Sequence, residues 1–149
     1  MVRILFVCTG NTCRSPMAEA ILKSKAVTGV EVKSAGVFAN NGSPASSHAR
    51  AVLKENDISE DHRSSMLTDA EINWATYIFT MTTSHKTSVV RQFPNALEKT
   101  FTLKEYAGTT FNKDIVDPYG GPLELYRDTF LDIQTTIDKI IERLTLEAN

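Results

Sequence analysis

The sequence predicts an α/β fold, in which a parallel β-sheet lies between two layers of helices. Short runs of β-branched and aromatic residues alternate along the chain with amphipathic helical patterns. Elements in this β-α-β-α order form parallel sheets with right-handed crossovers. A binding crevice forms in such sheets beyond the carboxyl ends of the strands, where the strand order reverses. We therefore expect the segments that follow the first and third strands to lie near each other.

The first half of the chain contains two predicted strands and three predicted helices. Buried strands are marked by apolar runs, and helix starts by a Ser-Pro pair, a turn cluster before a proline, and a capping box. In order, they are a strand over Ile4–Val7, a helix with Ser15 as N-cap and Pro16 in its first turn, a strand over Val30–Ala35 that ends at Gly36, a helix from Pro44 to about Glu55, and a short helix that starts at Thr68–Glu71.

The second half of the chain is predicted in the same way. It alternates strand and helix once more and then ends in a long helix with apolar residues at helical spacing. The predicted elements are a strand over Tyr77–Met81, a helix over Ser84–Phe93 that Pro94 closes, a weaker strand over Lys99–Leu103, and an amphipathic helix over Leu123–Leu146.

Length and composition indicate one globular domain over residues 1–149, with 42% hydrophobic and 23% charged residues. The net charge of -2 disfavours a protein dedicated to nucleic acid. The apolar stretch Ile4–Val7 is too short for a signal peptide, and no run is long enough for a membrane helix, so we expect a cytoplasmic protein. Two cysteines and three isolated histidines predict neither a disulfide scaffold nor a metal site.

The segment Val7–Pro16 (VCTGNTCRSP), between the first strand and the first helix, carries the candidate chemistry. Backbone N–H groups at a helix start, together with the helix dipole, form a positive cradle that suits a tetrahedral dianion. Gly10 and Asn11 are residue types that adopt left-handed backbone angles, which a loop around an anion needs. The Arg14 guanidinium can hold two phosphate oxygens and keeps its charge.

Cys8 is expected at the floor of this cradle. A free thiol is mostly protonated at neutral pH, but a positive environment favours the nucleophilic thiolate. The Ser15 hydroxyl is a candidate donor to that sulfur. In the alternative interpretation Cys8 is a small buried apolar residue and Arg14 a surface charge. The strand, the Ser-Pro helix start and the Gly-Asn pair inside the loop favour the nucleophile.

The segment VCTGNTCRSPMAEA closely resembles the phosphate-binding loop of the low-molecular-weight protein tyrosine phosphatases, and the resemblance covers nearly the whole chain. Ser34–Gly36 resembles the end of that family's second strand, and Asp117–Gly120 its general-acid loop. The resemblance implies a three-layer fold with a four-stranded parallel sheet of order 2-1-3-4. It also implies an enzyme without metal or other cofactor that acts on phosphorylated proteins. We expect a monomer with no nucleic-acid or membrane partner.

The resemblance also implies a mechanism. The Cys8 thiolate attacks phosphorus, and Asp117 protonates the leaving atom and then activates water against a phosphocysteine intermediate. The Asp-Pro-aromatic-Gly match selects Asp117 over the nearby Asp114. Asn11 is expected to hold the loop by side-chain hydrogen bonds. The transferring oxygens are expected to be held by the Arg14 guanidinium and by the backbone amides of Thr9, Gly10, Asn11, Thr12, Cys13 and Arg14.

Thr12 points to a substrate class. Tyrosine-specific members of the family usually carry an apolar residue such as Ile there, whereas Thr resembles the bacterial protein arginine phosphatases. The segments SAGVFA, FTLKEY and DPYGG also resemble that branch. A hydroxyl there can accept a hydrogen bond from a guanidinium or order the hydrolytic water, an interaction worth about ten- to hundredfold in rate. The alternative is a neutral β-branched replacement in a phosphotyrosine phosphatase.

Two aromatic residues and the second cysteine complete the candidate site. We expect Phe38 and Tyr119 to form walls that grip the flat part of the substrate, with a core position as the alternative for Phe38. Tyr119 stands where we expect Phe in the arginine branch. The family uses a second cysteine to protect the nucleophile from overoxidation, which implies a reversible Cys8–Cys13 disulfide. The alternative for Cys13 is a small buried residue.

Other functions are less compatible with the sequence. A thiol-coupled arsenate reductase needs later redox cysteines, and none follows Cys13. A phosphocysteine carrier lacks the arginine and the late Asp-Pro, and an inactive reader of phosphorylated residues has no need of Cys8, Arg14 and Asp117 together. His85 is expected on a helix surface, and His62 in a solvated turn.

Overall fold

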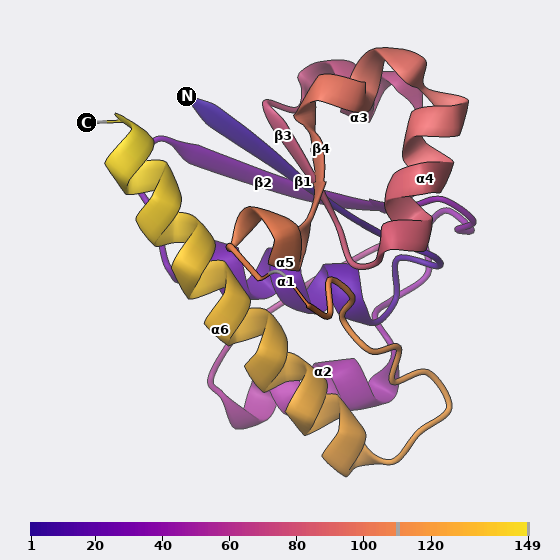
Figure 1. Cartoon of the computed structure of the whole chain (residues 1–149). Helices are drawn as coiled ribbons and strands as arrows, with labels where there is room; N and C mark the ends of the chain where they lie inside the picture. Colours follow the sequence, from indigo (N-terminus) through magenta and orange to yellow (C-terminus); the bar gives the residue numbers. More distant parts are fainter. Residues whose placement is uncertain (110, 149) are drawn as a thin grey trace.

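Four parallel strands form the centre of the molecule in the order β2-β1-β3-β4, which confirms the expected topology (Figure 1). The computed structural model describes residues 1–109 and 111–148, so the other two residues of the expected 1–149 domain lie outside the described residues. The strands are β1 (Val2–Cys8), β2 (Val30–Gly36), β3 (Tyr77–Thr80) and β4 (Thr100–Thr102).

Helices cover both faces of this sheet, as predicted (Figure 1). One layer contains α1, α2 and α6, and the opposite layer contains α3 and α4. The helices are α1 (Arg14–Ser24), α2 (Ser47–Glu55), α3 (Asp69–Trp74), α4 (Thr83–Gln92), a 3-10 helix (Pro94–Lys99), α5 (Leu103–Tyr106) and α6 (Leu123–Ala148).

The central strand β1 is buried on both sides. Ile4 and Phe6 belong to the core cluster under α1 and α6, whereas Leu5 and Val7 belong to the cluster under α3 and α4. This alternation is the period-2 pattern of a strand, and burial of both faces explains why the sequence there is continuously apolar. β1 lies between β2 and β3, so its carboxyl end opens where the strand order reverses. Cys8 is the last residue of β1 and is thereby fixed at that point.

Two predicted helix starts are wrong by a few residues. Helix α1 begins at Arg14, and Ser15 does not cap it, because the Ser15 hydroxyl is bonded to Cys8 and Asn11 instead. Helix α2 begins at Ser47 rather than Pro44. Its N-cap is the preceding serine, whose hydroxyl accepts a hydrogen bond from the Ala49 N–H.

Two predicted strands are shorter than expected. β3 ends at Thr80, one residue before Met81, and β4 ends at Thr102. Leu103, expected in the strand, is the first residue of the short helix α5. The cause is a capping box, in which the Thr102 hydroxyl accepts from the Glu105 N–H and the Glu105 carboxylate accepts from the Thr102 N–H.

The remaining predicted elements agree with the structure to within one or two residues at their ends. The capping box at Thr68 starts α3, and the long amphipathic pattern is α6. Pro94 does follow α4, but it opens a 3-10 helix that the sequence did not reveal. Among the residues that the structure describes, no helix is long and apolar enough to cross a membrane.

Candidate active site

The loop between β1 and α1 surrounds a cavity of about 240 Å³. The cavity brings together the expected nucleophile, cation and acid, although Asp117 lies more than a hundred positions from the other two. Its lining residues are Cys8, Thr9, Gly10, Thr12, Cys13, Arg14, Asp117 and Tyr119. The expected crevice beyond the central strand is therefore present.

The loop leaves main-chain donors unused. Carbonyl groups of the loop accept hydrogen bonds from outside it, at Thr9 from the Phe38 N–H and at Thr12 from the Ser46 N–H. The N–H groups of residues 10–13, by contrast, have no acceptor among the described residues. Unpaired amides at a helix start are the groups that bind an oxyanion, so the loop has the donor set that a phosphoryl group requires.

Asn11 holds this loop in shape, as expected. It is fully buried, and its φ of 57° lies in the left-handed region. Its Nδ2 donates to the hydroxyls of Ser15 (2.8 Å) and Ser34 (2.9 Å), and its Oδ1 accepts from the Ser65 N–H (2.9 Å). Gly10 does not have a positive φ, so that part of the prediction is wrong. Of these two residues, only Asn11 adopts the left-handed backbone conformation.

The Ser15 hydroxyl is placed to donate to the Cys8 sulfur. The Ser65 N–H fixes the orientation of the Asn11 amide, whose Nδ2 can only donate to the Ser15 oxygen. The Ser15 hydroxyl is therefore free to donate in turn to Cys8 Sγ, 2.8 Å away. This geometry confirms the expected contact between Ser15 and the sulfur, and it suits a sulfur that carries negative charge.

A buried carboxylate anchors the network from behind. Burial alone would raise the pKa of Glu19, but hydrogen bonds from His62, Lys23 and Ser34 lower it to about 2. The His62 Nε2 donates to the Asn11 carbonyl at 2.6 Å, and its side chain is only 6% exposed. The expectation of a solvated turn at His62 is therefore wrong, because the imidazole is inserted between the loop and Glu19.

His85 is also placed differently from the prediction. Its side chain points inward from α4, and Nε2 lies 2.8 Å from the Thr9 hydroxyl. Its Nδ1 is buried and has no hydrogen-bond partner among the residues that the structure describes. Burial, and secondly the charge of Arg14, lower the pKa of His85 to about 4, so the imidazole is neutral at pH 7. It supports the first residue of the loop without adding a second cation beside Arg14.

This placement predicts a pH dependence of stability. The unfolded chain protonates His85 near its usual pKa of 6.5, but the folded chain does so only near 4. The unfolded state therefore binds more protons in this window, and stability falls as the pH is lowered from 6.5 towards 4, by on the order of 2 kcal/mol. Urea denaturation across the window should show this loss. The His85→Gln variant, which keeps a polar group for Thr9, should show a smaller loss, and equal losses would contradict the assignment.

Arg14 and Asp117 face each other across the cavity. The guanidinium is 4% exposed, and its Nη1 donates to the Ile115 carbonyl at 2.9 Å. Its Nη2 lies 3.7 Å from the Asp117 carboxylate, whose side chain is about half exposed. The rival Asp114 is turned away and accepts from the N–H and hydroxyl of Thr83. The structure thus gives Asp117 access to a bound phosphoryl group and gives Asp114 a role in fixing the loop.

The expected substrate walls are placed unequally. Tyr119 lines the cavity and is 79% exposed. Phe38 is 82% exposed and is not among the lining residues, so its alternative position in the core is wrong. Its main-chain N–H reaches the catalytic loop by donating to the Thr9 carbonyl, but its side chain does not form the expected wall of the cavity. Thr12 lines the cavity, as expected, and is half-buried.

The second cysteine lies in a polar environment. Cys13 Sγ is 3.4 Å from the Tyr126 hydroxyl and 3.5 Å from the Ser46 hydroxyl. Burial, and secondly the contact with Cys13, raise the pKa of Tyr126 to about 12. Both cysteines are free and buried, and both line the same cavity.

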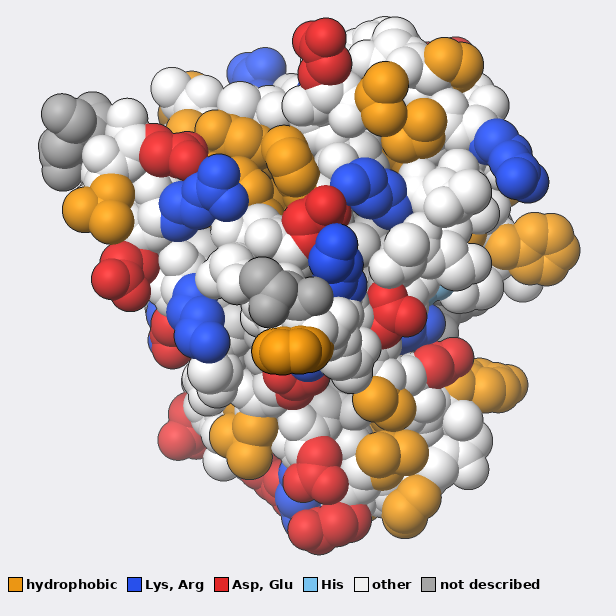
Figure 2. Space-filling view, in the orientation of Figure 1, with side chains coloured by type: hydrophobic (Ala, Val, Ile, Leu, Met, Phe, Trp, Pro, Cys, Tyr) orange, Lys and Arg blue, Asp and Glu red, His pale blue; other side chains and the backbone are white. Residues whose placement is uncertain are grey.

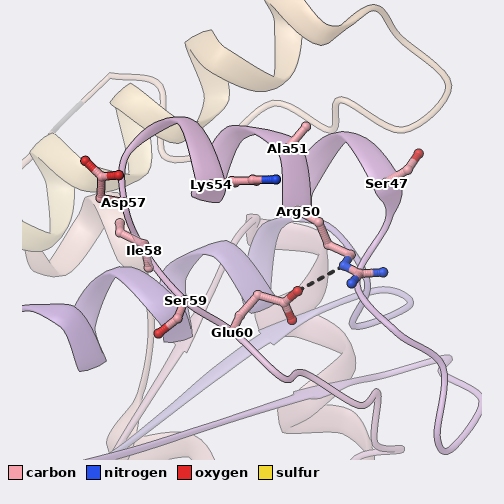
Figure 3. Close-up of a pocket in the computed structure, with 8 residues that line it drawn as sticks. All are labelled: Ser47, Arg50, Ala51, Lys54, Asp57, Ile58, Ser59 and Glu60. Atoms are coloured by element: carbon pink, nitrogen blue, oxygen red, sulfur yellow. Dashed lines mark hydrogen bonds and ion pairs between the residues drawn. The ribbon is translucent and has the colours of Figure 1, made fainter.

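A larger hollow of about 610 Å³ lies elsewhere, between α2 and the segment that follows it (Figure 3). It contains no thiol, and its two cations are balanced by two carboxylates, with Arg50 bonded to Glu60 at 3.1 Å. In the described part of the chain, no cluster of three or more His, Cys, Asp or Glu side chains suits a metal ion.

Sequence reasoning missed three residues that support the loop: Glu19, His62 and His85. Glu19 left a readable signal, because it lies four positions after Ser15 and so shares its helix face. It is also a carboxylate within the otherwise apolar stretch Pro16–Leu22. The two histidines left none, because they reach the loop from segments 51 and 76 positions away.

A doubly covered parallel sheet, with an anion-binding loop over a cysteine and a carboxyl group opposite, is the arrangement of the cysteine-dependent phosphatases. The family itself is shown by comparison with known proteins. The model of the low molecular weight phosphotyrosine protein phosphatase family matches residues 3–149, and the chain belongs to this family.

Several relatives have a more specific name. A protein-arginine-phosphatase of Geobacillus stearothermophilus is 56% identical over 145 residues, which is 97% of each chain. One of Bacillus subtilis (strain 168) is 42% identical over 144 residues, or 95% of each chain. The structure of YwlE arginine phosphatase from Geobacillus stearothermophilus superposes with a TM-score of 0.96 at 55% identity, and the match covers 99% of this chain and 95% of that one. A Cys-to-Ser mutant of YwlE arginine phosphatase with a phosphorylated active-site serine matches with a TM-score of 0.93 at 39% identity, over 97% and 96% of the two chains.

Proposed function

We propose that this enzyme hydrolyses phosphoarginine in proteins through a phosphocysteine at Cys8. The observation that carries the proposal is the set of loop amides at residues 10–13, which have no acceptor among the described residues, together with the Cys8 sulfur 2.8 Å from the Ser15 hydroxyl. The arginine phosphatases that resemble this chain over nearly its full length support the choice of substrate.

The reaction proceeds in two displacements. In the first, a Cys8–phosphorus bond forms as the phosphorus–nitrogen bond breaks, and Asp117 gives its proton to the departing guanidine nitrogen. In the second, Asp117 takes a proton from water, the oxygen attacks phosphorus, and the cysteine leaves as thiolate with release of inorganic phosphate. Arg14 and the loop amides stabilise the transferring oxygens in both steps.

Thr12 tests the choice of substrate. In the Thr12→Ile variant, kcat/KM for phosphoarginine peptides should fall about ten- to hundredfold relative to that for phosphotyrosine peptides, because the substrate loses a polar partner in the cavity. Thr12→Ser, which keeps the hydroxyl, is the matched control and should retain the preference. A wild-type enzyme with no preference for phosphoarginine would refute the proposal.

Phosphotyrosine is the alternative substrate. Tyr119 favours it, because an exposed aromatic side chain at the cavity can stack on a phenyl ring. The same two displacements then transfer a phosphoryl group from oxygen instead of nitrogen. A phosphocysteine carrier or a reader of phosphorylated residues is disfavoured, since Asp117 lies 3.7 Å from Arg14, where it can promote hydrolysis.

We also propose that Cys13 protects the nucleophile from oxidation. A peroxide oxidises the Cys8 thiolate to a sulfenic acid, and the Cys13 thiol then displaces water to form a disulfide, which a dithiol reduces. After treatment with hydrogen peroxide and then dithiothreitol, wild type should recover most of its activity, whereas Cys13→Ser should recover much less. Equal recovery would exclude this role. Cysteine thiols stay reduced in the cytosol, so we propose that the enzyme acts in the bacterial cytoplasm. We also propose that it is a monomer.

A further inference from the structure

A second groove, of about 580 Å³, lies on the outer side of α4. It is formed by α4, the 3-10 helix, the start of α5 and the segment that leads to Asp117. Its lining residues are Thr83, Lys86, Thr87, Val90, Arg91, Pro94, Leu97, Thr102, Glu105 and Lys113. None of them belongs to the catalytic cavity.

Part of this groove is apolar and open to solvent. Val90, Pro94 and Leu97 line it, and Leu97 is 59% exposed. Figure 2 shows hydrophobic side chains gathered over the upper end of α4, with Lys and Arg side chains to either side of them. An exposed apolar patch rimmed by charged groups is typical of a protein-binding surface.

The side chains that line the groove carry more positive than negative charge. Lys86 lies 2.9 Å from Glu105, which is the only carboxylate among the lining residues. Arg91 and Lys113 form no ion pair among the described residues, although the charge of Lys113 also acts on Glu105 and Asp114 is bonded to Thr83 at the edge of the groove. The lining residues themselves carry three cations and one carboxylate, so the groove keeps a positive excess. The hollow beside α2 differs, because its cations and carboxylates balance (Figure 3).

The groove is close to the catalytic cavity along the chain. Lys113 lies four residues before Asp117, a span of at most about 14 Å in an extended chain. Helix α4 joins the two sites from the other side, since Thr83 at its start lines the groove and His85, two residues on, contacts Thr9 in the catalytic loop. A single peptide segment can therefore reach both.

We propose that this groove binds an acidic segment of the phosphorylated substrate protein. Asp or Glu side chains of that segment pair with Arg91 and Lys113, and an apolar side chain between them packs on Leu97. Charge complementarity of this kind raises the rate of encounter and selects among substrates. The inference rests on the proposed phosphatase function and adds a preference for the sequence around the phosphorylated residue.

The test compares protein-like substrates with a small one. In the double variant Arg91→Glu/Lys113→Glu, we expect kcat/KM to fall about tenfold or more for phosphoarginine peptides that carry a Glu-rich segment some four to eight residues from the phosphorylated residue. The same variant should hydrolyse free phosphoarginine at the wild-type rate. Wild type should prefer the Glu-rich peptides over peptides with Gln in their place, and added salt should remove that preference.

The matched control is Arg50→Glu/Lys54→Glu in the α2 hollow, which makes the same change in net charge. An equal loss in this control, no loss in the groove variant, or a parallel loss on free phosphoarginine would each overturn the proposal. If either variant has a lowered melting temperature, Arg91→Gln/Lys113→Gln replaces it with the same expected direction. If the enzyme instead prefers phosphotyrosine, phosphotyrosine peptides of the same design test the groove separately from the choice of substrate.

Discussion

Replacement of Cys8 by serine should abolish turnover, with a loss in kcat on the order of 10⁴-fold or more. The serine hydroxyl fits the same space beside Ser15, but it does not ionise at neutral pH as a thiol does in a positive cradle. Phosphate release from phosphoarginine peptides measures the loss.

Anion binding should survive in the same variant, because the amides of residues 10–13 and Arg14 remain in place. Calorimetric titration with inorganic phosphate should give a dissociation constant within a few-fold of the wild-type value. The control is Cys13→Ser, which alters the other thiol of the cavity and should keep most of the turnover. Activity that persists in Cys8→Ser would refute a sulfur nucleophile.

Replacement of Asp117 by asparagine should reduce kcat about 10²- to 10³-fold on phosphoarginine peptides. Asparagine keeps the shape and the hydrogen bond from the Tyr119 N–H, but it can neither give a proton to the leaving nitrogen nor take one from water. Formation of the intermediate from p-nitrophenyl phosphate should be much less affected, because nitrophenolate leaves without a proton. Single-turnover kinetics separates the two steps.

Asp114 is the control for this prediction. Asp114 binds the N–H and hydroxyl of Thr83, so Asp114→Asn should lower the melting temperature. Its kcat should stay much closer to the wild-type value than that of Asp117→Asn. A larger loss of kcat in Asp114→Asn than in Asp117→Asn would reverse the two assignments.

The catalytic loop could be predicted because its signals are local. A buried strand that ends at Cys8, a helix start near Ser15 and an arginine between them lie within a few residues, and each has a direct physical meaning. The error at Ser15 is instructive. A hydroxyl at a helix start suits an N-cap, but here it is bonded to Asn11 and to the sulfur, so the same side chain serves the site instead of the helix.

The support behind the loop could not be predicted from such patterns. His62 and His85 reach the loop only after the sheet has brought distant segments together, and a single imidazole carries no periodicity. The boundary of α2 was missed for a related reason. Pro44 suits a first helical turn, but Ser46, whose N–H is bonded to the Thr12 carbonyl, sets the actual start.

Transfer of the phosphoryl group to Cys8 is the central claim of this mechanism, and trapping the intermediate tests it most directly. Asp117→Asn should be mixed with p-nitrophenyl phosphate, quenched in acid within milliseconds and digested for mass spectrometry. We expect one phosphoryl group on the peptide that contains Cys8, with fragment ions that place it on that sulfur. Phosphate release without any phosphorylated Cys8, or a phosphoryl group on another residue, would contradict the mechanism.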